Sequence, residues 1–115
     1  SSPNISIETK IDEVLGEKYI APMLLIPFIE NAFKHGISLK HRSWIRITLH
    51  TDQDKLYFDV YNSKQKKSEQ DPEKDKSGIG LKNVKQRLEL LYSERHELII
   101  RDTPEEFFVH LTLQL

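Results

Sequence analysis

Four polar side chains that could do chemistry lie close together in the stretch PFIENAFKHG, residues 27 to 36. They are Glu30, Asn31, Lys34 and His35. Together they offer a carboxylate, a neutral amide oxygen, an ammonium group and an imidazole. In a helix their positions around the axis would be about 0°, 100°, 40° and 140°, and apolar residues fill the opposite arc. The stretch therefore predicts an amphipathic helix whose polar side is either a binding site or a face turned to water.

The water-facing alternative accounts for most of this polar side. Glu30 and Lys34 have the i,i+4 spacing of an ordinary ion pair on a helix surface, which contributes about 0.2–0.5 kcal/mol. Asn31 fits that alternative least well, because asparagine is a poor helix former and a neutral side chain in mid-helix gains nothing from the helix dipole. The residues alone leave both interpretations open.

A second candidate site is the sequence SGIGLKN, residues 77 to 83. Gly78 and Gly80 stand just before a predicted helix, and glycine lets the backbone approach a ligand closely. The N-terminus of a helix presents N–H groups and a partial positive charge, which favour an anion such as phosphate. Glycine before a helix is also an ordinary loop device, so this short pattern leaves the two interpretations equal.

The segment before this glycine pattern has no hydrophobic content. Residues 64 to 77 include no apolar side chain apart from one proline, so they cannot bury surface that would offset the entropy cost of ordering them. We therefore expect a mobile loop at about 63–77. Long structureless loops in a compact domain are often lids over a site, and the alternative is a plain surface insertion.

Length and composition bound the class of protein. The chain has 115 residues, enough for one domain with a hydrophobic core. Its 17 Lys and Arg nearly balance 18 Asp and Glu, so we expect no nucleic-acid partner and no membrane contact by this fragment. The lack of cysteine removes disulfide frameworks and thiolate zinc sites. The chain begins with Ser1 and shows no signal-peptide pattern, so we expect a domain of a longer protein.

Hydrophobic periodicity predicts the order of strands and helices. Period-two alternation indicates strands at residues 5–11, 45–49, 56–60 and 107–115, and the short apolar run at 98–101 also looks like a strand. Turns are expected at 51–54 and 102–105. The strand at 107–115 turns its odd-numbered side chains toward the core. Strands joined by tight turns, with helices between them, predict an α+β fold: a two-layer α/β sandwich with a mostly antiparallel sheet and helices on one face.

The two predicted helices have recognisable ends. The first begins at Pro22, which suits a first helical turn, and stops at Gly36. Pro27 lacks the N–H that would continue the helix, so we expect a late start or a kink there. The second helix follows the two glycines, after order resumes at Gly78, and runs to about residue 92. Its core stripe is the set Leu81, Val84, Leu88 and Leu91.

Two long motifs resemble those of a known family. Residues 22–36, PMLLIPFIENAFKHG, resemble the N box of the GHKL ATPases, in the form found in LytS/YehU-like sensor histidine kinases. Residues 78–92, GIGLKNVKQRLELLY, are similar to that family's second glycine box and the helix after it. The resemblance covers the chain from Ile5 to Leu115. It implies a histidine kinase-like (HATPase_c) catalytic domain over residues 1–115, with the Bergerat fold, an ATP lid at about 63–77, and ATP and Mg²⁺ as cofactors.

The resemblance assigns roles to the polar residues of the first motif. Asn31 would be the Mg²⁺ ligand and part of the ATP site, which explains a neutral oxygen in mid-helix. Glu30 would polarise the attacking nucleophile or its water. Lys34 and His35 would lie near the phosphates and the lid, where Lys34 adds positive charge in the transition state. His35 is not the phosphoacceptor, which the family carries on a separate helical domain upstream.

The second motif would hold the nucleotide. Its residues at the family's cofactor-binding positions are Gly78, Ile79, Gly80, Leu81, Asn83 and Arg87. The two glycines would shape the backbone around the triphosphate. Asn83 and Arg87 would lie one turn apart on the ligand side of the following helix.

The sequence departs from the family at the first glycine box. The usual motif is Asp-x-Gly, whose carboxylate accepts the amino hydrogen of adenine, and here Asn62-Ser63-Lys64 stands in its place. The amide oxygen of Asn62 can accept that hydrogen bond without the strength that a charge adds. Lys76 likewise occupies the place of the second box's leading glycine. We interpret the adenine end as a variant and weaker site.

The resemblance implies a function and partners. The chain would be the catalytic domain of a two-component sensor histidine kinase, which transfers the γ-phosphoryl group of ATP to a histidine on the upstream helical domain of the same protein. A response regulator would be the downstream partner. The full-length protein would be a homodimer anchored in the bacterial inner membrane, with this domain in the cytoplasm.

Two alternatives remain open at this point. The first is a degenerate domain without catalysis that kept the fold for signalling or docking, and Asn62 with Lys64 favours it. The second is an ATPase of the gyrase or MutL sort that uses water as the acceptor. The small size and the short run from Gly80 to the C-terminus disfavour this second alternative.

Overall fold

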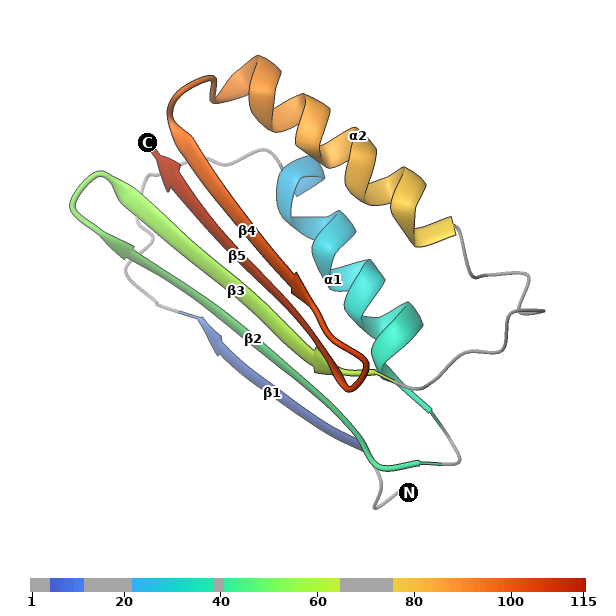
Figure 1. Ribbon diagram of the computed structural model, residues 1–115. Coiled ribbons are helices and arrows are strands. Elements are labelled where there is room, and N and C mark those ends of the chain that lie inside the picture. The colour runs from blue at the N-terminus through green and yellow to red at the C-terminus, as the bar shows by residue number, and fades with distance from the viewer. Residues whose placement is uncertain (1–4, 12–21, 39–40, 65–75) are drawn as a thin grey trace.

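Five strands form one sheet in the computed structural model of the chain, which describes residues 5–11, 22–38, 41–64 and 76–115 (Figure 1). The elements are β1 (Ile5–Ile11), α1 (Pro22–Gly36), β2 (Ser43–Asp52), β3 (Lys55–Ser63), α2 (Lys76–Leu91), β4 (His96–Asp102) and β5 (Glu106–Gln114). The order of the strands across the sheet is β1-β2-β3-β5-β4.

The connections between elements decide the strand directions. The chain passes through α1 between β1 and β2, and such a crossover returns it in the same direction, so these two strands are parallel. Short turns join β2 to β3 and β4 to β5, and these pairs are antiparallel, as is the pair β3 and β5. The predicted mostly antiparallel sheet is confirmed, with one parallel pair at the edge formed by β1.

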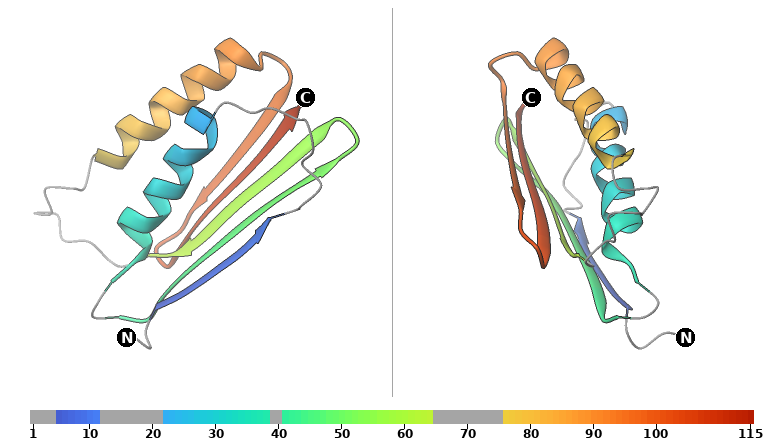
Figure 2. Two further views of the ribbon diagram at one scale, coloured as in Figure 1. Left: turned by 180° about the vertical axis from the view of Figure 1, so that it is seen from behind. Right: turned by 45° about the vertical axis from the view of Figure 1, so that its right-hand side comes forward.

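Both helices lie on the same face of the sheet (Figures 1 and 2). The core-facing side of the central strands follows the predicted alternation, because β3 and β5 bury every second side chain. The buried apolar residues of the two helices and of β3 and β5 are Leu24, Phe28, Ala32, Leu56, Phe58, Val60, Val84, Leu88, Val109, Leu111 and Leu113. The predicted two-layer sandwich is therefore confirmed.

Helix α1 begins at Pro22 and ends at Gly36, as predicted, and it continues through Pro27. Of the two outcomes expected at Pro27, the late start does not occur, and the kink stays a prediction. An interior proline costs about 3 kcal/mol, because it removes one hydrogen bond and crowds the preceding turn. Leu24 and Phe28 on either side of it are fully buried, and each such side chain contributes about 1.5–3 kcal/mol. Packing against the sheet thus offsets the cost of the proline.

Helix α2 differs from its prediction at both ends. It begins at Lys76, so Gly78 and Gly80 lie inside its first turns and not before them. Glycine adopts helical angles without steric cost, although each one in a helix costs about 1 kcal/mol relative to alanine. At the other end Leu91 is 55% exposed, and the expectation that it belongs to the core is wrong. The helix ends there, and Tyr92 packs against the core instead.

The predicted turns and lid have narrower limits in the structure. The turn between β2 and β3 is confined to residues 53–54, and Gln53 adopts the left-handed φ of 56° that such a tight turn requires. Ser63 belongs to β3, and residues 76–77 belong to α2. The rest of the predicted lid, residues 65–75, lies outside the described residues. Within the described part of the chain no helix is long and apolar enough to cross a membrane.

The face of the sheet away from the helices carries a row of aromatic side chains. Tyr61 lies edge-on to Trp44 on one side and to Phe108 on the other, with ring centroids 4.8 and 5.4 Å apart. The hydroxyl of Tyr61 donates a hydrogen bond to the carboxylate of Glu106. This bond is the main reason why the pKa of Tyr61 is raised above its ordinary value, and partial desolvation and the negative charge of Glu106 add to the effect.

The raised pKa of Tyr61 gives a testable pH dependence. The folded state favours the neutral phenol, so its contribution to stability is present below the ordinary tyrosine pKa of 10.0 and is lost as pH rises through the higher folded value. We expect Glu106→Gln to lower the pKa of Tyr61, because the substitution removes the carboxylate. The ultraviolet absorbance of tyrosinate, measured against a Tyr61→Phe control, reports it. An unchanged pKa would contradict the assigned cause.

A pair of leucines on α2 tests the packing of this helix. Leu88 is fully buried, whereas Leu90 is 82% exposed. Leu88→Ala should lower the free energy of unfolding by about 2–5 kcal/mol, because it leaves a cavity in the core. The same change at Leu90 should alter it by no more than about 0.5 kcal/mol. Urea unfolding of both variants measures the difference, and equal effects would show that α2 does not pack as described.

Candidate functional site

The candidate site lies where the end of α1 meets the end of β3. In Figures 1 and 2 the last turn of α1, the last residues of β3 and the first turn of α2 are at the same end of the molecule. Gly36, the last residue of α1, is buried against the side chain of Asn62. A Cβ atom added to Gly36 would lie only 2.9 Å from Nδ2 of Asn62. The segment that resembles the N box and the segment that stands in place of the first glycine box are therefore in direct contact.

Asn62 faces the helices and is fully buried. The alternation of β3 gives it the same side as Phe58 and Val60, so its amide enters the layer between the sheet and the helices. Its Nδ2 donates a hydrogen bond to the carbonyl oxygen of Ser63 at 2.7 Å. Its Oδ1 is buried and has no hydrogen-bond partner among the described residues. A buried amide oxygen without a partner costs about 1–3 kcal/mol, so this acceptor is a candidate contact for a ligand.

The hydroxyl of Ser63 joins three segments of the chain. It accepts a hydrogen bond from the backbone N–H of Trp44 at 2.9 Å, and it donates to the carbonyl oxygen of Gly36 at 3.1 Å. The carbonyl oxygen of Trp44, at 3.4 Å, is an alternative acceptor for the same proton. Ser63 thus ties the end of α1 to β2 and β3 at the point where Asn62 is buried.

The chain beyond β3 is fixed to the turn between β4 and β5. The backbone N–H of Lys64 donates to the carbonyl oxygen of Glu105 at 2.8 Å. The Lys64 ammonium group also forms an ion pair with Asp102. The ammonium group therefore points toward the β4–β5 turn.

The polar side of α1 divides into two parts. Glu30 and Lys34 are exposed, whereas Asn31 and His35 are partly buried. The Oδ1 atom of Asn31 is buried and, within the described part of the chain, has no hydrogen-bond partner. The water-facing interpretation therefore describes the first pair and fails for Asn31, which is the residue that the sequence had singled out.

The predicted residues of the second motif all lie on α2. The backbone of Gly78, Ile79 and Gly80 forms its first turns. Because the helix begins at Lys76, the N–H groups that have no partner within the helix come from its first turn, earlier than the sequence predicted. Leu81 packs against the core, Asn83 is exposed and Arg87 is partly buried. Helix α2 packs beside α1, so the two motifs are neighbours.

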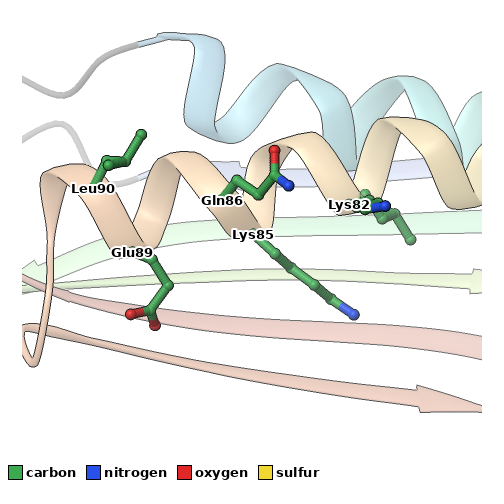
Figure 3. Close-up of a pocket in the computed structure, with 6 residues that line it drawn as sticks. Lys82, Lys85, Gln86, Glu89 and Leu90 are labelled. Atoms are coloured by element: carbon green, nitrogen blue, oxygen red, sulfur yellow. The ribbon is translucent and has the colours of Figure 1, made fainter.

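A hollow of about 740 Å³ lies along α2 and is separate from this meeting point (Figure 3). Its described lining consists of Leu81, Lys82, Lys85, Gln86, Glu89 and Leu90. Asn31, Gly36 and Asn62 are not among these residues. We place the candidate site at the two buried amide oxygens, because the hollow presents mainly exposed side chains of one helix.

Sequence reasoning missed two residues of this arrangement. Gly36 was predicted only as a helix stop, and Ser63 was assigned to the lid. The pair meets across 27 positions in the sequence, and no local pattern predicts such a contact. The burial of Asn62, in contrast, follows from the alternation of β3.

Comparisons with known proteins give a consistent result at the level of the fold. No protein-family model matches the chain, and no curated protein matches it. Among solved structures, the histidine kinase domain of the Erythrobacter litoralis EL346 blue-light activated histidine kinase is similar, with a TM-score of 0.62 and 14% identity over 98% of this chain and 52% of that one. The histidine kinase domain of the E. coli osmosensor EnvZ has a TM-score of 0.58 and 18% identity, over 95% and 74% of the two chains.

A third similar structure is the histidine kinase ThkA in complex with the response regulator protein TrrA. Its TM-score is 0.61, with 19% identity over 96% of this chain and 34% of that one. The fold is that of histidine kinase catalytic domains. At these identities the likeness to histidine kinases establishes the fold alone, and the chain spans about half of the Erythrobacter kinase chain. The finer likeness to LytS/YehU-type kinases stays a prediction.

The contribution of the Ser63 hydroxyl to the stability of the fold can be tested by measuring the free energy of unfolding. Ser63→Ala leaves the Trp44 N–H and the Gly36 carbonyl without this partner, so we expect the free energy of unfolding to fall by about 1–3 kcal/mol. Ser93→Ala, at an exposed position after α2, serves as the control and should have little effect. Urea unfolding measures both. A Ser63 variant as stable as the control would contradict the role assigned to the hydroxyl.

Proposed function

We propose that the chain is the ATP-binding catalytic domain of a two-component sensor histidine kinase. The observation that carries the proposal is the pair of buried amide oxygens, on Asn31 and Asn62, that lack hydrogen-bond partners among the described residues. They belong to the two segments, α1 and the end of β3, that Ser63 ties together. The fold of histidine kinase catalytic domains supports the same assignment.

Asn31 fits the role of a Mg²⁺ ligand. Mg²⁺ prefers hard oxygen ligands and is usually held by one or two protein groups together with phosphates and water. The Oδ1 atom of Asn31 is a neutral oxygen that the fold leaves without a partner. A bound cation would therefore remove an energetic cost that the described structure carries at this position.

Asn62 fits the adenine end of the same site. Its Oδ1 atom is an acceptor, and the amino group of adenine is a donor. The hydrogen bond would be weaker than one to the carboxylate of the usual motif, since charge assistance roughly doubles the strength of such bonds. We therefore expect ATP binding to persist with reduced affinity.

The exposed residues of α1 suit a reaction with a separate domain. Bound ATP supplies the γ-phosphoryl group, which passes to a histidine nitrogen with release of ADP. Glu30 and Lys34 are exposed, so a histidine on another domain can reach them. Glu30 would polarise the nucleophile, and Lys34, with His35 beside it, would stabilise charge in the transition state.

The second motif would hold the phosphates of ATP. The proposed partners concern the full-length protein. The proposed nucleotide contacts on α2 are Gly78, Ile79, Gly80, Leu81, Asn83 and Arg87. The similar kinase ThkA forms a complex with a response regulator, and we propose a response regulator as partner here. The phosphoacceptor domain, homodimerisation and membrane anchoring belong to the same proposal for the full-length protein.

Calorimetric titration tests nucleotide binding. We expect ATP and ADP to bind the chain at millimolar concentration or below, and Mg²⁺ to tighten ATP binding. Asn31→Ala should abolish the Mg²⁺-dependent part of the affinity, because it removes the oxygen ligand. Gln86→Ala, which removes a neutral amide from the exposed side of α2, is the matched control and should bind like the parent chain.

Phosphoryl transfer is measured next, with the helical phosphoacceptor domain present and label on the γ-phosphate of ATP. We expect the label to be transferred to the phosphoacceptor domain and retained there. With the Asn31→Ala variant, no label should be transferred. If no nucleotide binds at millimolar concentration, the proposal is overturned. The remaining alternative is then the degenerate domain that serves for signalling or docking. Steady release of phosphate without labelled protein would support the ATPase that uses water.

A further inference from the structure

The side-chain amide of Asn62 is held in one orientation. Its Nδ2 donates to the Ser63 carbonyl oxygen at 2.7 Å. Turning the amide by half a turn would bring Oδ1 against that carbonyl, and two acceptors would then face each other. Asn62 is fully buried, so a turned amide would gain no compensating contact with bulk water. Oδ1 is therefore the atom that remains available to a ligand.

Gly36 packs against the side chain of Asn62 and keeps that side chain in place. A Cβ atom at position 36 would lie 2.9 Å from Nδ2, 3.0 Å from Cβ and 3.2 Å from Cγ of Asn62. Rotation of the amide end alone would not relieve this crowding, because Cβ is attached directly to the backbone of Asn62. Any residue larger than glycine at this position must displace Asn62 or the end of α1.

Ser63 is hydrogen-bonded to both Asn62 and Gly36. Its carbonyl oxygen accepts from the amide of Asn62, and its hydroxyl donates to the carbonyl oxygen of Gly36 at 3.1 Å. The residue that fixes the orientation of the amide thus also fixes the backbone that packs on it.

We propose that Gly36 and Ser63 are positioning residues that keep Asn62 as an acceptor, so that the site selects a 6-amino purine over a 6-oxo purine; this rests on the proposed function. A 6-amino group donates to Oδ1, whereas a 6-oxo group sets acceptor against acceptor. A carboxylate accepts through either oxygen, whichever way it turns, and an amide accepts in only one orientation. Fixing that orientation lets a neutral side chain recognise the base in place of a carboxylate.

The test compares two nucleotides that differ at position 6 of the base. The chain is titrated by calorimetry with ATP and with inosine triphosphate, each with Mg²⁺, and the ratio of the two dissociation constants is measured. In the parent chain we expect ATP to bind at least about tenfold more tightly, the effect of one buried hydrogen bond against an unpaired acceptor. Gly36→Ala and Ser63→Ala should each reduce the preference to about threefold or less. The methyl group added at position 36 would displace the Asn62 amide from the Ser63 carbonyl. Loss of the Ser63 hydroxyl would release the Gly36 backbone that packs on the amide, so that the amide can turn and donate to a 6-oxo group.

Two control variants separate this effect from general damage. Ser43→Ala removes another buried serine hydroxyl, which accepts from the Ser38 N–H at 2.8 Å, and should leave the ratio unchanged. Asn31→Ala should weaken both nucleotides equally, because it acts at the metal and not at the base. Because the ratio compares two ligands of one variant, partial loss of folded protein does not change it. Should Gly36→Ala fail to fold, Ser63→Ala carries the test.

The outcomes are distinct. A reduced preference in both variants, with both controls unchanged in ratio, supports the proposal. A parent-like ratio in both variants overturns it while nucleotide binding by the parent chain stands. A reduced preference in only one variant overturns the assignment of the other residue. If the parent chain binds neither nucleotide, the proposed function itself is overturned, and this inference falls with it.

Discussion

The contact between the end of α1 and the end of β3 is the constraint on which the candidate site depends. One hydroxyl, that of Ser63, bonds the carbonyl of Gly36 and the N–H of Trp44, and so joins a helix to two strands. Glycine at position 36 leaves room for the side chain of Asn62 at this junction. The position of Asn62, and through α1 that of Asn31, follows from this junction.

The rest of the molecule supports that junction through packing. The buried faces of β3 and β5 form a continuous apolar surface, and α1 covers it with α2 beside it. The core therefore fixes the axis of α1, while the junction fixes its end. A helix held in this way can carry exposed charged residues and partly buried polar ones on neighbouring positions, as Glu30 and Asn31 show. Within the described residues, Asn31 and Asn62 each carry a buried amide oxygen without a hydrogen-bond partner.

Much of this could be predicted from residue patterns, and the failures have physical causes. Strand alternation predicted the buried side of β3 over residues 56–60, because alternation is a local property of extended chains, and Asn62 continues the same side beyond the predicted strand. The same reasoning erred at Leu91, where the end of the helix outweighed the periodic pattern. It also placed Gly78 before α2, since glycine is read as a break although its backbone tolerates a helix.

The sequence by itself determined the elements, the two-layer class of fold and the polar motif that contains Asn31. Periodicity and motif spacing act along the chain, so they are visible without coordinates. Only the tertiary structure decided that Gly36 lies against Asn62, that Ser63 bonds both segments, and that the Asn62 amide has one orientation. These contacts join residues distant in the chain, and whether a buried polar atom has a partner depends on every segment around it.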